Sequence, residues 1–305
     1  MPREPGGYIG GMRDLHLGII LPNYGEALDP EGLARVALAA EASGFDSAWV
    51  TDHVMVPDGE VARVYQRISE ALVTLGFLVG RTRTLRLGTS ALIVPLREPL
   101  LALKQLVSLD FLSGGRIVTV VAAGWLEPEF ATLGARFAGR GRRLDEWLAL
   151  VAGVLPQAPG PVRHTGGSRV EDAWLAPAPA RPGGLELWGG GASPRALARA
   201  ARLGVWHPVA LRPEQLRPLV ADLRARRPDA RVVLRLAAYL TDRPDPKGTD
   251  ERGRYALAGP PDWLAERLGD FVTLGVDGFV LNLDHQTPGL EDRVQRFAAE
   301  VAPLL

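Results

Sequence analysis

Two adjacent residues, Asp52 and His53, combine chemically active side chains with a strand-like segment that ends just before them. The apolar run at residues 45–51 reads as a buried strand, and the pair follows it directly. In parallel α/β proteins the carboxyl ends of strands form the catalytic face, where an imidazole can donate or accept a hydrogen bond. We therefore take Asp52 and His53 as candidate catalytic residues. The alternative is a histidine in a solvated loop.

A glycine-rich turn at residues 189–193 is the second candidate site. It precedes Pro194 and a helical pattern, so bare backbone N–H groups and the positive helix end can together face a phosphate. The alternative is a tight turn in which glycine supplies a positive φ. The candidate cofactor-binding residues here are Gly189, Gly190, Gly191, Ala192 and Ser193.

Three weaker signals accompany these motifs. Ser90 and Ala91 place small side chains late in a strand, where a planar cofactor can lie against the backbone, although small residues also fill cores. His207 follows a strand and reads either as a ligand contact or as a structural histidine. The arginine cluster at residues 136–143 reads either as an anion clamp or as solvated ion pairs. No histidines have the i, i+4 spacing of a metal site, so we expect none.

Apolar runs alternate with amphipathic segments along the whole chain, which indicates repeated βα units. Eight such units favour a single TIM-like (β/α)8 barrel of the α/β class. The Pro/Gly-rich stretch at 156–184 is too long for a connector and predicts an insertion or lid. The expected strands lie near 15–21, 45–51, 85–94, 116–122, 185–188, 205–210, 231–239 and 278–284. The expected helices lie near 30–43, 63–80, 98–111, 141–154, 193–203, 213–226, 261–274 and 289–302.

Composition bounds the functional class. The 305 residues include 35 basic and 35 acidic side chains, which removes the usual electrostatic reason to expect a nucleic-acid or membrane partner. The absence of cysteine excludes disulfides and thiol nucleophiles. Without a signal-peptide-like or membrane-spanning run, we expect a cytoplasmic protein. Residues 1–12 read as a disordered tail and residues 13–305 as the barrel domain.

Taken together, these residues resemble the bacterial luciferase-like superfamily, and most closely its branch of oxidoreductases that depend on the deazaflavin coenzyme F420. The resemblance is specific for the superfamily and suggestive for the cofactor. It is carried by residues 17–25, 41–54, 85–118, 122–146, 185–208 and 258–268.

The resemblance implies roles for individual residues. Asp52 and His53 would lie beside an isoalloxazine-type ring, and Ser90–Ala91 would be a non-prolyl cis peptide that forms a bulge behind it. Residues 189–193 would hold the phosphate. Gly124 and Trp125 would belong to a loop beside the cofactor, and His207 would also contact it.

Three functions follow from these expectations. The first is hydride transfer between F420 and a small organic substrate, with His53 as proton donor. The second is an FMN-dependent two-component monooxygenase, in which a partner reductase supplies reduced flavin. The third is a barrel that binds a cofactor without turnover. Relatives are often dimers, so the resemblance also allows a homodimer.

Overall fold

The computed structural model describes residues 15–59, 61–250 and 252–305, and the tail predicted at residues 1–12 lies outside these ranges. Eight parallel strands form a closed barrel, because β8 pairs with β9 and so joins the two ends of the sheet. The predicted TIM-like (β/α)8 fold is therefore confirmed. The barrel strands are β1 (His16–Ile20), β2 (Ser47–Val50), β3 (Arg86–Ile93), β4 (Ile117–Ala122), β7 (Glu186–Gly190), β8 (Val205–His207), β9 (Arg231–Leu240) and β11 (Gly278–Asn282).

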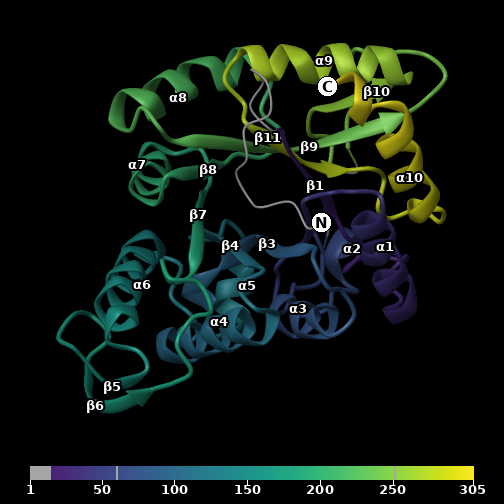
Figure 1. The fold of residues 1–305 in the computed structure, drawn as a ribbon. Coiled ribbons are helices and arrows are strands. Elements are labelled where there is room, and N and C mark those ends of the chain that lie inside the picture. Colours follow the sequence, from purple (N-terminus) through teal and green to yellow (C-terminus); the bar gives the residue numbers. More distant parts are fainter. Residues whose placement is uncertain (1–14, 60, 251) are drawn as a thin grey trace.

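Helices surround the strands (Figure 1). Their starts follow local sequence signals: the Asp29 side chain accepts a hydrogen bond from the Gly32 N–H at 2.6 Å at the start of α1, where Pro30 is the first helical residue. The principal helices are α1 (Pro30–Ala42), α3 (Ala71–Val79), α4 (Pro99–Ser113), α6 (Arg140–Val154), α7 (Pro194–Leu203), α8 (Pro213–Arg226), α9 (Pro261–Thr273) and α10 (Leu290–Glu300). The short helices are α2 (Ala62–Tyr65) and α5 (Glu127–Thr132), with 3-10 turns at Val94–Leu96, Leu155–Gln157 and Ala302–Leu304.

The core has two layers. The larger one lies between the strands and the helices, and a smaller cluster that includes Trp49 and Trp188 fills the barrel interior. The rings of these two tryptophans are 5.0 Å apart. A Cβ atom added to Gly88 of β3 would lie 2.5 Å from the Trp49 ring, so the barrel interior needs glycine there.

Two expectations about individual elements need correction. The helix predicted at 63–80 is divided into α2 and α3, because Glu70 caps α3 by accepting from the Val73 N–H at 2.8 Å. Beyond the eight expected strands, β10 (Ala256–Gly259) pairs with the carboxyl half of β9.

The insertion predicted at 156–184 contains an antiparallel hairpin of β5 (Gly160–His164) and β6 (Val170–Leu175). It lies beside α6 at the edge of the barrel (Figure 1). It leads into the amino end of β7, whereas lids on barrels of this type lie at the carboxyl ends of strands. The lid interpretation is therefore wrong.

Within the described part of the chain, none of the helices has the length and apolar character needed to cross a bilayer.

Candidate functional site

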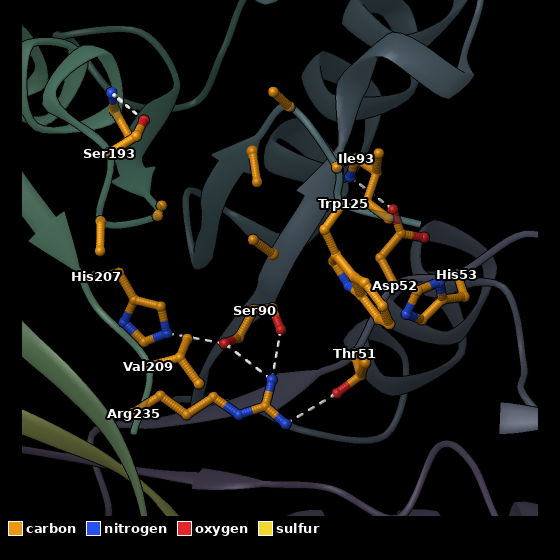
Figure 2. A pocket seen from close by; sticks show the side chains of 18 of the residues that line it. Thr51, Asp52, His53, Ser90, Ile93, Trp125, Ser193, His207, Val209 and Arg235 are labelled. Carbon is orange, nitrogen blue, oxygen red and sulfur yellow. Dashed lines mark hydrogen bonds between the residues drawn. The ribbon is translucent and has the colours of Figure 1, made fainter. Parts of the chain in front are cut away.

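A cavity of about 460 Å³ opens at the carboxyl ends of the barrel strands, which falls in the usual size range of ligand sites. Figure 2 shows that His53 and Trp125 lie on one side of it and Ser193 on the other, with Ser90 and Arg235 at its floor. Its lining includes eleven of the predicted site residues, namely Asp52, His53, Ser90, Ala91, Gly124, Trp125, Gly190, Gly191, Ala192, Ser193 and His207.

Gly189 is the one predicted site residue that does not line this cavity. A Cβ atom added to it would lie 2.6 Å from the Cα atom of Ala200 in α7. The residue therefore allows β7 and α7 to approach each other closely, which positions the turn that follows.

The carboxylate of Asp52 is fully engaged by protein groups. It accepts hydrogen bonds from the Arg97 guanidinium at 2.7 and 2.8 Å and from the Ile93 N–H at 2.8 Å. Arg97 also pairs with Glu70 at 2.6 Å. Although burial opposes its charge, these two carboxylates raise the pKa of Arg97 above its ordinary value. Asp52 therefore has a structural role at the site, because its hydrogen bonds join the end of β2 to the end of β3.

His53 is buried and paired with a carboxylate that lies 76 residues away in sequence. Its Nδ1 atom is 2.7 Å from Oε2 of Glu129, whose Oε1 accepts from the Val54 N–H at 2.7 Å. Because a carboxylate accepts hydrogen bonds, Nδ1 donates, and Nε2 has no hydrogen-bond partner among the described residues. The pair therefore fixes the imidazole with Nε2 available for a ligand.

Two aromatic rings flank His53. The Tyr65 ring centroid lies 4.4 Å from the imidazole, and the Trp125 ring stands edge-on to it at 6.0 Å. Tyr65 is buried, whereas Trp125 is 49% exposed. These rings restrict the access of water to the imidazole and give this side of the cavity an apolar, planar wall.

The floor of the cavity is a hydrogen-bonded cluster centred on Ser90. The Arg235 guanidinium donates to the Ser90 carbonyl at 2.6 Å, to Ser90 Oγ at 3.3 Å and to Thr51 Oγ1 at 3.2 Å. Since Ser90 Oγ accepts from Arg235, its own proton is available to His207 Nε2, 2.8 Å away. Burial, followed by the charge of Arg235, lowers the pKa of His207 to about 3. His207 is thus a neutral acceptor.

The Ser90–Ala91 peptide bond is cis, as the resemblance implied, and the β3–β4 register shifts between Thr89 and Leu92. Both residues line the cavity.

Three glycines shape the walls. Gly124 has φ +86°, and an added Cβ atom would lie 2.7 Å from Ile93 and 2.8 Å from the Phe130 ring. Gly191 has φ +97°, which favours glycine at the turn into α7. A Cβ atom at Gly190 would lie 3.0 Å from Val120. Backbone, rather than side chain, therefore borders the cavity at these positions.

The start of α7 is exposed and lies beside two arginines. Ser193 caps the helix by accepting from the Ala196 N–H at 3.2 Å. Arg199 of α7 donates to the Gly141 carbonyl at 2.8 Å, which holds the beginning of α6, and with it Arg140, close to α7. Arg140 itself donates to the Gly124 carbonyl at 2.9 Å. Of the predicted arginine cluster, Arg140 reaches the cavity, whereas Arg142 pairs with Glu146 as the solvated interpretation expected.

Sequence reasoning missed several residues of this site. Arg235 interrupts the apolar run of β9, so a charged residue in a buried strand was an available signal. Glu129 carried no local signal, because only the folding of α5 against the loop after β2 brings it to His53. The others are Tyr65, Arg199, Arg252 and Arg254.

The family model for luciferase-like monooxygenases matches residues 17–246. The chain belongs to this family. It is similar to an FMNH(2)-dependent dimethylsulfone monooxygenase of Pseudomonas fluorescens, with 27% identity over 290 residues that cover 85% of this chain and 77% of that protein. Membership supports an enzyme of the luciferase-like oxidoreductase and monooxygenase class.

Solved structures of other proteins share the fold. An F420-dependent secondary alcohol dehydrogenase in complex with an F420-acetone adduct superposes with a TM-score of 0.77 at 17% identity, covering 95% of this chain and 99% of the other. EDTA monooxygenase from Chelativorans sp. BNC1 gives a TM-score of 0.77 at 18% identity, covering 95% and 93%. The same fold therefore occurs in an F420-dependent dehydrogenase and in a monooxygenase.

Proposed function

We propose that this protein is an oxidoreductase that uses reduced F420 for hydride transfer to or from a small organic substrate. The observation that carries the proposal is the arrangement of one cavity. An oriented imidazole, His53, stands on one side of it, and the exposed start of α7 stands on the other. A cofactor with a planar ring and a phosphate suits both ends.

The phosphate end is formed by residues 191–193 with Arg140 and Arg199. Backbone N–H groups at the start of α7 and the positive end of the helix dipole favour an anion. The Arg140 guanidinium adds positive charge to this part of the cavity lining, and Arg199, which pairs with Asp145, holds the beginning of α6 and with it Arg140 close to α7. Gly190 and Gly191 leave room that a Cβ atom would fill.

The ring would lie over the floor formed by Ser90, Ala91 and His207, with Arg235 beneath. When bound, reduced F420 supplies a hydride, and the protein supplies orientation and the proton. The Arg235 guanidinium places a positive charge at the floor, which would favour an electron-rich ring. Glu129 accepts a hydrogen bond from His53 Nδ1 and so fixes the imidazole, and Nε2 would exchange the proton with the substrate.

FMN-dependent monooxygenation is the second candidate, because the similarity to the dimethylsulfone monooxygenase extends over 85% of this chain. In that case a partner reductase would supply reduced FMN. The same cavity residues would hold the ring and the phosphate, so the two candidates differ in the reaction with oxygen rather than in the site.

A comparison of two reactions tests the proposal. Purified protein is incubated with reduced F420 and a panel of small ketones and aldehydes, and separately with reduced FMN, oxygen and the same panel. We expect oxidation of F420 that depends on the carbonyl compound and needs no oxygen. Oxygen consumption coupled to oxygenated products with FMN alone would replace our proposal by the second candidate. A protein that binds neither cofactor would contradict both.

A further inference from the structure

The cavity is strongly cationic although the whole chain carries no net charge. Among the described residues that line it, the single carboxylate is that of Asp52, which Arg97 already neutralises. A cleft lined by one sign of charge concentrates ligands of the opposite sign. The lining arginines are Arg140, Arg199, Arg235, Arg252 and Arg254.

Two of these arginines are neutralised by protein carboxylates, and Arg252 is not. Arg199 pairs with Asp145 at 2.7 Å, and Arg254 pairs with Asp250. Within residues 15–59, 61–250 and 252–305, no carboxylate lies at ion-pair distance from Arg252. Among those residues, the Arg252 side chain makes its polar contact with the Tyr65 hydroxyl, to which Nη1 donates at 2.8 Å. Its charge is thus available to a ligand.

Aromatic rings hold the Arg252 guanidinium in place. It lies 5.0 Å from the Trp125 ring centroid and 5.4 Å from that of Tyr65, both at cation–π distance. These are the two rings that flank His53. Arg252 is therefore fixed beside the imidazole, on the side of the cavity that faces away from Ser193 (Figure 2 shows His53, Trp125 and Ser193).

We propose that Arg252 is a specificity-determining residue, and that the substrate of this enzyme carries an organic anion, a carboxylate or a sulfonate, which this guanidinium binds. The inference rests on the proposed function, in which the reacting carbon lies near His53. An anion on Arg252 places the rest of a short substrate against Trp125 and Tyr65, within reach of that imidazole. The planar guanidinium matches the geometry of a carboxylate or sulfonate.

The test compares two probes of equal shape, phenylacetate and the neutral phenylacetamide, by calorimetric titration. We expect phenylacetate to bind the wild-type protein at least tenfold more tightly, since a hydrogen bond between two charged groups is stronger than one to a neutral amide. In Arg252→Gln the ratio of the phenylacetate affinity to the phenylacetamide affinity should fall to about one. The affinity for phenylacetamide itself should change little. Arg212→Gln is the matched control, because Arg212 also stacks on an aromatic ring, Tyr255, outside the cavity.

Several results would overturn the inference. Equal affinity for the two probes, no binding of phenylacetate, or a preference that survives in Arg252→Gln would each do so. A second titration uses protein that is saturated with whichever of F420 and FMN binds. If the cofactor displaces phenylacetate and Arg252→Gln weakens the cofactor equally, Arg252 serves the cofactor and the inference is wrong. Failure of both cofactors to bind contradicts the proposed function, and the probe preference of the free protein still decides the role of Arg252.

Discussion

Nδ1 of His53 lies 2.7 Å from Oε2 of Glu129, and both side chains are buried. A carboxylate placed there orients the imidazole and favours one tautomer. Glu129→Gln should therefore lower turnover by about tenfold to a hundredfold. This range corresponds to the free energy that one hydrogen bond to a charged group contributes. Glu127→Gln, an exposed position in the same short helix, is the control and should leave turnover unchanged.

A second readout of this pair needs no substrate. In protein with nitrogen-15-labelled histidine, the Nδ1–H proton of His53 should give an NMR signal shifted downfield by the short bond to the carboxylate. Glu129→Gln should move that signal upfield, and Glu127→Gln should not. An unchanged signal in Glu129→Gln would contradict the pairing.

The role of His53 in proton transfer is tested at the residue itself. His53→Ala should reduce turnover by roughly 10²–10⁴-fold, the usual contribution of a general acid, while cofactor affinity falls much less. His53→Asn keeps a hydrogen-bond donor that does not titrate, so it separates donation from proton transfer. His164→Ala, in β5 outside the cavity lining, should behave as wild type. Full turnover in both His53 variants would make this histidine structural.

The ion pair between Asp52 and Arg97 should contribute to stability rather than to chemistry. Asp52→Asn leaves a nearly buried guanidinium with Glu70 as its remaining carboxylate, so the free energy of unfolding should fall by about 3 kcal/mol. Asp222→Asn removes an exposed i, i+4 pair with Arg226 and should cost less than about 0.5 kcal/mol. Chemical denaturation measures both, and equal losses would contradict this role.

Three buried histidines should make the protein sensitive to mild acid. Burial, with nearby arginines, lowers the pKa of His16, His207 and His285 from 6.5 to about 3. The unfolded chain therefore takes up these protons below pH 6.5 and the folded chain does not, so stability is lost as pH falls. Between pH 6 and 5 we expect a loss of about 3–4 kcal/mol, because each histidine contributes at most about 1.36 kcal/mol per pH unit.

Denaturation at a series of pH values checks this expectation. His207→Gln keeps an acceptor for the Ser90 hydroxyl and should reduce the slope by about one third. A slope that is unchanged in this variant would show that His207 also takes up its proton in the folded state.

Local sequence signals predict much of this fold. Each barrel strand is an apolar run, and residues such as Asp29 and Ser193 mark helix starts through contacts only three residues away. The predicted helix at 63–80 was wrong in one respect, because α2 ends at Tyr65 and a cap at Glu70 starts a separate helix, α3.

Local sequence signals predicted less of the site than of the fold. Asp52 and His53 were found from their place after a strand, but their partners Arg97 and Glu129 are 45 and 76 residues away. Only the closure of the barrel brings them together. The proximity of Arg252 to Trp125 has the same origin, since it joins loops after two different strands.

The most direct test of a phosphate-bearing cofactor in this cavity is a calorimetric titration of F420 and of FMN into wild type, Ser193→Asp and Ser193→Asn. Asp and Asn both cap helices well, so the fold of α7 is kept and the variants differ in one charge. We predict binding to wild type, near-wild-type affinity in Ser193→Asn, and at least a tenfold loss in Ser193→Asp, because two like charges about 4 Å apart repel by about 1–4 kcal/mol. Equal affinity in the two variants, or no binding of either cofactor to wild type, would contradict the account.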